Sequence, residues 1–392
     1  MKTFKLTFLA IALMVIQSCT HDAILDESTT PGSIEMINWK PEDGIRKFIP
    51  QQYLSQFSGQ EIEYDESLLR GEDKLELRGN QISIPAGSTD ALAGAIAAAG
   101  YGDVIVLEAG MHTQNGTVTI DKQVTILGYD ATLHFTGTAF NPTLQLSAAM
   151  HIKPSAAYST IRGIKFTHGD AFPGFCIFND GAEGIRLLNN SIENWAFGIL
   201  SYRSRYCVFS KNSIAASTLW QTVPGFNTIG IAISDGNHNH VISNVIKNAL
   251  FGIFTGGSQG IDFRNFTYNC AFGQILCKLT PDVLTVNGTL ILTQSSTSNW
   301  LVMFNNAENN FQSGYLVVDG ANKNHLDHNK ASNNAFYDIE VAGATNAFGY
   351  PTPAAFDNSV SAYTALKIKD CGTNTKIRGG TVEPNDAAHP CR

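Results

Sequence analysis

Charged residues recur at one position of a sequence repeat, and their types suit acid–base chemistry. Counting onward from the glycine of each copy gives a column of Arg203, Asp235, Gly257, Lys278 and, further on, Asp319. A guanidinium or ammonium group can neutralise the carboxylate of a sugar acid, so that the adjacent C–H becomes acidic and a base can remove the proton. The column predicts Lys278, Arg203 and Asp235 as catalytic residues, with Asp235 as an orienting group or a calcium ligand.

The spacing within this column follows from the expected stacking of the copies. Arg203 and Asp235 are expected one step apart, about 4.8 Å, and Lys278 two steps from Asp235, about 10 Å. Charged residues at turn ends are usually solvated, and such surface pairs often have no special role. The column is therefore also compatible with a protein that has no catalytic activity.

Aromatic residues enter the chain where the repeat is interrupted. One insertion contains Trp220 and Phe226, and a second one spans residues 344–358. Insertions in repeat proteins map to loops that commonly lie on the binding face. We expect Trp220, Phe226, Tyr202 and Asp319 to bind substrate, with the aromatic rings stacked on sugars. The insertions could equally serve only to cover the coil.

The histidines are a second candidate for chemistry, as metal ligands. His240 and His325 are expected about four coils, or roughly 19 Å, apart, so they cannot share a metal. Strand alternation places His325 and Asp327 on one face and His328 on the other. No metal site is predicted from them.

The elements that position these residues follow from the repeat itself. The pattern Asn-x-x-x-Asn-x-x-x-Gly begins at Asn190, Asn244, Asn265 and Asn306, with variant copies at Asn212 and Asn329. Its period of about 21 to 23 residues, sometimes doubled, is typical of a solenoid. Short β-branched runs between Gly and Asn, such as residues 231–233, favour strands over helices. We expect coils of three short strands and three turns.

Stacking of such coils predicts two ladders. Asn tolerates the left-handed backbone region at a turn, and its amide can bond to the Asn of the coils above and below. Four phenylalanines occupy the place before the last position of the pattern, and we expect them to stack inside the coil: Phe197, Phe251, Phe272 and Phe336.

With this repeat, the chain resembles the right-handed parallel β-helix family, the fold of pectate lyases and many exported polysaccharide-active proteins. The resemblance covers roughly residues 85 to 385 and implies an all-β solenoid with a short N-terminal capping helix. Residues 90–100 read as that helix, with Asp90 or Thr89 as N-cap and Gly100 as C-cap. Residues 102–110 then read as the first strand.

The catalytic signatures of the family are not found in this sequence. It has neither an adjacent Asp pair with Gly-His-Gly, as in polygalacturonase-like hydrolases, nor the Arg-x-Pro-x-x-Arg of classical pectate lyases. The resemblance therefore implies a fold, and a fold alone does not confer an activity.

The N-terminus predicts export. Lys2 and Lys5 precede an almost wholly apolar run over residues 7–16, and the following Gln17-Ser18-Cys19 resembles a bacterial lipobox in which Cys19 is lipidated. We expect a signal peptide at 1–19, an acidic tether or extension at 20–84, and the β-helix domain at 85–392. A plainly secreted protein with an incidental Cys19 is the alternative.

The composition of the chain limits the classes of molecule that it is expected to bind. The net charge of −8 argues against a non-specific grip on nucleic acid. Cys371 and Cys391 could form a disulfide in an exported protein, although pairing cannot be read from sequence. The hypothesis is an extracytoplasmic, lipid-anchored β-helix, periplasmic or at the surface of a bacterium, that engages an acidic polysaccharide. It acts either as a polyuronide lyase, with calcium as a conceivable cofactor, or as a non-catalytic glycan-binding or structural protein.

Overall fold

The computed structural model describes residues 79–138, 148–171, 174–223, 226–277, 285–286, 289–290, 297–344, 353–363, 366–386 and 391. Cys19 and Lys278 lie outside the described residues, as do the expected signal peptide and most of the expected acidic extension. Within the described ranges, no helix combines the length and apolar character needed to cross a membrane.

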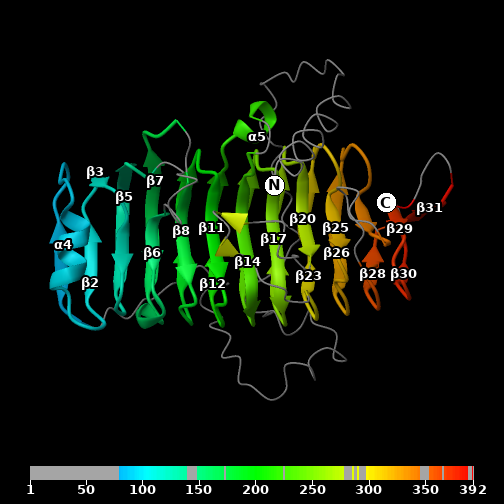
Figure 1. Ribbon diagram of the computed structural model, residues 1–392, viewed down its shortest axis with the longest axis horizontal. Coiled ribbons are helices and arrows are strands. Elements are labelled where there is room, and N and C mark those ends of the chain that lie inside the picture. The colour runs from blue at the N-terminus through cyan, green and yellow to red at the C-terminus, as the bar shows by residue number, and fades with distance from the viewer. Residues whose placement is uncertain are drawn as a thin grey trace. The chain divides into compact units, whose positions relative to one another are not determined.

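The chain winds into coils of three short strands, and the coils stack in parallel. One complete coil consists of β9 (Arg186–Leu188), β10 (Ser191–Glu193) and β11 (Phe197–Tyr202). Each strand pairs in register with the equivalent strand of the next coil, as Ile192 does with Ile214. Figure 1 shows the coils following one another from cyan to red. The predicted parallel β-helix is confirmed.

Three columns of strands result. The first column contains β1 (Gln81–Ile84), β2 (Val104–Leu107), β5 (Thr125–Thr136), β7 (Thr160–His168), β9, β12 (Val208–Ser210), β15 (His240–Ile242), β18 (Ile261–Phe263), β23 (Leu301–Met303), β26 (His325–Ser332), β28 (Ser359–Ala362) and β30 (Lys376–Arg378). The second contains β3 (Gly110–Asn115), the later parts of β5, β7 and β26, β10, β13 (Ser213–Ala215), β16 (Val245–Lys247), β19 (Phe266–Tyr268) and β24 (Asn306–Glu308). The third contains β4 (Val118–Ile120), β6 (Ala148–Ile152), β8 (Phe175–Asp180), β11, β14 (Ile229–Asn237), β17 (Phe251–Ser258), β20 (Phe272–Cys277), β25 (Tyr315–Val318), β27 (Ile339–Val341), β29 (Lys367–Asp370) and β31 (Thr381–Glu383). The first two columns form one 18-stranded sheet, and the third forms an 11-stranded sheet. The antiparallel pair β21 (Thr285–Val286) and β22 (Thr289–Leu290) stands apart from both.

The predicted capping helix is present as α4 (Ala91–Ala98), with Leu92, Ala95 and Ile96 buried. Its caps differ from the prediction. Asp90 stands at the N-cap but has a φ of 54° and no side-chain bond to the helix, because its carboxylate accepts the backbone N–H of Asn115 at 2.7 Å. The C-cap is Ala99, not Gly100. Strand β1 precedes the helix and pairs with β2, so the first strand comes earlier than residue 102.

The asparagine ladder exists, with one correction of register. In each step the backbone N–H and the side-chain amide of one asparagine donate to Oδ1 of the next, at 3.0 and 3.1 Å from Asn190 to Asn212. The buried members are Asn190, Asn212, Asn244, Asn265, Asn305 and Asn329. Asn306 was expected in the ladder, but it lies in β24 opposite Phe266. The ladder residue is the preceding Asn305.

The left-handed backbone conformation belongs to the second asparagine of the pattern, not to the ladder residue. Asn194, Asn248 and Asn269 have φ values of 65°, 64° and 52°. The two properties that suit Asn to this fold, a tolerated positive φ and a hydrogen-bonding amide, are therefore divided between two positions in the copies that begin at Asn190, Asn244 and Asn265.

The phenylalanine column lies on the outer face of the third column, which corrects the expectation that it fills the coil. The coil interior is filled by a largely aliphatic cluster that includes Ile199 and Ile231. The phenylalanines belong to a second, separate apolar cluster, where the Phe175 and Phe197 rings stack at 4.4 Å. Phe336 belongs to neither cluster and is 37% exposed.

The C-terminal coils are joined to the end of the chain by a disulfide between Cys371 and Cys391. This is the bridge that the sequence allowed. The four other described cysteines, Cys176, Cys207, Cys270 and Cys277, are buried thiols.

Candidate functional site

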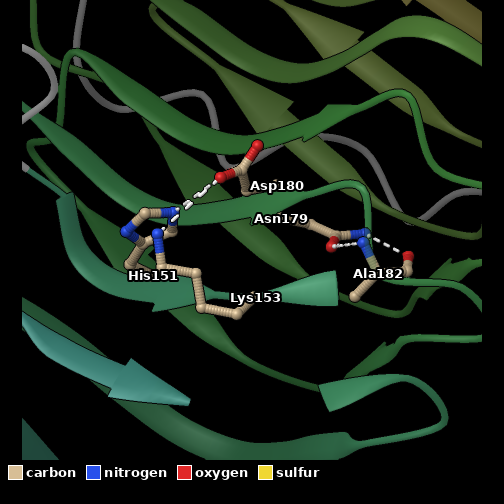
Figure 2. Close-up of polar contacts among 5 residues, drawn as sticks. All are labelled: His151, Lys153, Asn179, Asp180 and Ala182. Carbon is tan, nitrogen blue, oxygen red and sulfur yellow. Dashed lines mark hydrogen bonds and ion pairs between the residues drawn. The ribbon is translucent and has the colours of Figure 1, made fainter. Parts of the chain in front are cut away.

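An exposed polar group lies on the outer face of the third column, at the ends of β6 and β8. His151 in β6 is paired with Phe178 in β8, and its Nε2 lies 3.2 Å from Asp180 Oδ2. Lys153 Nζ lies 3.9 Å from the same oxygen. Figure 2 shows both basic side chains directed at this carboxylate.

The turn after β8 fixes the position of Asp180. Alternation turns the preceding Asn179 inward, where its amide donates to Ala182 O at 3.0 Å and accepts the Ala182 N–H at 3.0 Å. A further bond from Asn179 Nδ2 to Ser201 Oγ, at 3.1 Å, ties this turn to the next coil. The buried Asn179 thus holds the backbone on which Asp180 points outward.

The surroundings of His151 favour a neutral imidazole. Burial lowers the pKa of His151, the Lys153 charge lowers it further, and only Asp180 acts in the opposite direction. The ring also packs against Phe178, with centroids 5.1 Å apart. In a neutral ring that donates Nε2–H to Asp180, Nδ1 carries the lone pair and can accept a proton.

The group continues into the next two coils. Tyr202 at the end of β11 is paired with Asp180 on one side and with Ser234 on the other. Arg203 Nε lies 3.3 Å from Asp235 Oδ2, and its guanidinium carbon stands 4.9 Å from the centre of the Tyr202 ring. The predicted proximity of Arg203 and Asp235 is confirmed.

We refer to these six residues as the polar strip: His151, Lys153, Asp180, Tyr202, Arg203 and Asp235. Arg203 has a side chain that is 58% exposed, and Asp235 one that is 31% exposed, so solvent and ligands reach both. Arg203 and Asp235 have φ values of 49° and 53° at the corner that ends the third column. The strip is open and follows the stacking direction of the coils.

The rest of the predicted column departs from this arrangement. A bulge in β14 pairs Gly257 with Gly236 and not with Asp235. Asp319, four coils or about 19 Å from Arg203, is only 4% exposed and accepts a hydrogen bond from the Cys277 thiol at 3.1 Å. The structure therefore separates Asp319 from the polar strip.

The aromatic residues of the first insertion make structural contacts. Trp220 lies in α5 (Leu219–Thr222), donates its indole N–H to Asn248 O at 2.8 Å and meets Phe311 edge-on at 5.9 Å. Trp220 and Phe226 are partly buried against the outer apolar cluster. These contacts match the covering role, and a role in substrate binding stays a prediction.

A search for metal ligands among the described residues gives no group of three or more His, Cys, Asp or Glu that could hold an ion. Asp235, the expected calcium ligand, is paired with Arg203.

Three members of the polar strip were not predicted: His151, Lys153 and Asp180. The repeat pattern first appears at Asn190, so the column was not extended to earlier coils. The signal was nevertheless present, because one repeat length back from Tyr202 leads to Asp180. The spacing of His151 and Lys153 places both on one face of a strand.

The match to a family model agrees with this architecture. A family model for the right handed beta helix region matches residues 109–273. No curated protein sequence gives a significant match. Among solved structures, the catalytic domain of a GH87 alpha-1,3-glucanase in complex with nigerose is similar at 13% identity and a TM-score of 0.44, over 78% of this chain and 68% of that one. An alginate lyase from Paenibacillus sp. str. FPU-7 is similar at 13% identity and a TM-score of 0.42, over 78% of this chain and 99% of that one. The periplasmic alginate epimerase AlgG gives 10% identity and a TM-score of 0.32, over 78% and 74%.

Proposed function

We propose that this right-handed parallel β-helix binds an acidic polysaccharide along the polar strip and removes the proton beside a uronate carboxylate. The observation that carries the proposal is the contact of His151 with Asp180 at 3.2 Å, in one open strip with the cations Lys153 and Arg203. Burial lowers the pKa of His151, which favours the neutral ring that a base requires. An extended polymer suits a strip that continues from coil to coil at about 4.8 Å per step.

The side chains have separate roles in this reaction. Lys153 and Arg203 lie two coils apart, about 10 Å, and one or both neutralise the carboxylate of the bound sugar unit. His151 Nδ1 takes the proton from the carbon beside that carboxylate, while Asp180 orients the ring and stabilises the imidazolium that forms.

Removal of the proton is followed by cleavage of the glycosidic bond. The electron pair left on carbon forms a C=C bond as the glycosidic oxygen on the next carbon departs. The departing oxygen takes up a proton, which His151 or water supplies. The net result is one unsaturated sugar end and one free hydroxyl, which is the outcome of a lyase.

A non-catalytic glycan-binding protein is the second candidate, and one observation favours it. Each carboxylate of the strip has a basic partner, since Asp180 lies near Lys153 and Asp235 near Arg203. Such compensated pairs fit a surface that recognises a polymer without reacting with it.

Turnover on a panel of polyuronides, followed by absorbance of the unsaturated product with and without calcium, tests the proposal. We expect product with the wild-type protein and a loss of at least about a hundredfold with His151→Ala, as for removal of a general base. Lys165→Ala is the matched control, because Lys165 pairs with Glu193 at 2.9 Å on the other sheet, where both side chains are 45% exposed. Binding without product on any polyuronide would favour the second candidate. Equal rates for wild type and His151→Ala would remove His151 from the mechanism.

Export and lipid anchoring through Cys19 complete the proposal, with support from sequence alone. Growth with radiolabelled palmitate is expected to label the wild-type protein in the membrane fraction. Label retained in Cys19→Ser would contradict the anchor.

A further inference from the structure

The turn that leads from the third column to the first has a positive φ in nine successive coils. The column of residues at this position is Tyr158, Gly184, Tyr206, His238, Gln259, Asn299, Lys323, Asp357 and Asn374, with φ between 54° and 66°. Glycine and asparagine suit this conformation, whereas large side chains adopt it at a conformational cost. Aromatic rings occupy it in three of the four coils that carry the polar strip, and Gly184 occupies it in the coil of Asp180.

We propose that Tyr158, Tyr206 and His238, the aromatic edge, form a platform on which sugar rings of the same acidic polysaccharide stack. This inference rests on the proposed function and adds the binding surface. Tyr158 and Tyr206 each place a bulky, exposed side chain in a disfavoured backbone conformation, which points to a role beyond folding.

The two tyrosine rings of the aromatic edge are exposed and are held by their neighbours, whereas His238 is half-buried. Tyr158 is 58% exposed, and its ring lies against Gly184, where any side chain would collide with it. Tyr206 is 38% exposed and stacks on His238, with centroids 5.1 Å apart and an interplanar angle of 28°. Tyr158 and Tyr206 are two coils, or about 10 Å, apart along the stack.

The aromatic edge borders the polar strip along its length. Tyr206 follows Arg203 by three residues, and His238 follows Asp235 by three. A polymer that lies along the polar strip therefore runs beside these rings.

The chemistry of the edge suits an acidic sugar. The apolar faces of a pyranose pack on an aromatic ring, while the tyrosine hydroxyl at the rim can bond to sugar hydroxyls. Besides burial, the charge of Arg205 lowers the pKa of His238, so Arg205 lies close enough to the aromatic edge to attract the carboxylates of a bound uronate. Burial, followed by this charge, lowers the pKa of His238, so its ring is a neutral aromatic surface near pH 7.

Asparagine substitutions separate binding from folding. Tyr158→Asn and Tyr206→Asn remove the rings and supply a residue that tolerates positive φ, so the melting temperature is expected to stay equal or to rise. The matched control is Tyr129→Ala, since Tyr129 is 66% exposed and lies within β5, at the register shift between the first two columns.

Isothermal titration of the full chain with size-defined oligouronides, drawn from the polyuronides that the wild type binds, measures the effect. The double variant is expected to bind at least about tenfold more weakly, and Tyr129→Ala like the wild type. A double variant that binds as tightly as wild type overturns the aromatic edge and leaves the proposed function standing. Weakened binding in the double variant, with no turnover by the wild type, supports the edge while the lyase proposal fails. No binding of any polyuronide by wild type overturns both.

Discussion

Replacing Asp262 by Asn is expected to stabilise the protein at pH 8 by up to about 4 kcal/mol and to change little near pH 4. Asp262 occupies the coil interior in β18, at a position filled by Val241 in the preceding coil and by Val302 in the following one. It is 1% exposed, and its carboxyl accepts one hydrogen bond, from Asn265 at 2.5 Å. Burial raises the pKa of Asp262 from 3.8 to about 7.

Each of the three strands of this coil places one polar side chain in the interior. Thr267 in β19 and Gln274 in β20 also face inward, where the adjacent coil has Ile246 and Ile253. Thr267 Oγ1 and both polar atoms of the Gln274 side chain are buried and have no hydrogen-bond partner among the described residues. Neither side chain bonds to the Asp262 carboxyl, and the single bond from Asn265 offsets only part of the cost of burying its charge.

The direction of the pH effect follows from the two pKa values. The unfolded chain releases the Asp262 proton as the pH rises through about 3.8, whereas the folded chain holds it up to about 7. The folded state binds more protons between these values, so this group lowers stability as the pH rises from about 4 to 7, and the loss is complete above 7.

Urea unfolding at several values between pH 4 and 8 measures the effect. Tryptophan fluorescence is a suitable signal because Trp300, fully buried in the next coil, lies against Gly260. The difference in unfolding free energy between Asp262→Asn and wild type is expected to grow with pH and then level off. Asp357→Asn, at an exposed turn, is the matched control. A difference that does not vary with pH would refute a buried, protonated Asp262.

Three further predictions concern the frame that holds the site. Asn212→Ala should lower the free energy of unfolding by about 3 kcal/mol, because it leaves buried hydrogen-bond partners in two coils unbonded. Asn306→Ala, outside the ladder, should lower it far less. Urea titration compares the two variants, and equal losses would contradict the ladder. Gly198→Ala should cost about 1–3 kcal/mol, since a Cβ there would meet a carbonyl oxygen of the next coil at 2.6 Å; a neutral result in thermal melting would show that the coil can shift. Reducing the disulfide between Cys371 and Cys391, which are 20 residues apart, should lower the free energy of unfolding by about 3 kcal/mol. Backbone hydrogen exchange should then become faster in β29 to β31. Unchanged protection there would contradict a stabilising role of the disulfide.

The fold could be predicted because a stacked coil copies its turn chemistry into the sequence. The register was predicted least well where the chain is interrupted. The next ladder member comes 40 residues after Asn265, and the glycine pattern points to Asn306 instead of Asn305. This error of one residue replaces Asn305, whose side-chain amide is buried in the ladder, with Asn306, which lies in β24.

The faces of the third column could not be read from alternation. Gly198 and Ile199 both face inward, so Phe197 lies on the outside although it stands two residues before an interior position. Only coordinates reveal such an irregularity. Asp262 was missed for a different reason, because a carboxylate in a strand reads as a surface residue until its neighbours in other coils are known.

Within the candidate site, Arg203 and Asp235 were predicted because their coils carry the repeated pattern. His151, Lys153 and Asp180 belong to coils without that pattern, so their proximity depends on register and not on local sequence. The positions that align with Tyr206 along the stack likewise have no shared residue type, only a shared backbone conformation.

Proton exchange at carbon is the most direct test of the central claim that His151 removes a proton beside a uronate carboxylate. An acidic polysaccharide that the protein binds is incubated with it in D₂O, and the C–H signal beside the carboxylate is followed by NMR. Loss of this signal, or its conversion to an unsaturated product, with the wild type but not with His151→Ala is the predicted result. A signal that stays unchanged on every bound polyuronide would contradict the claim.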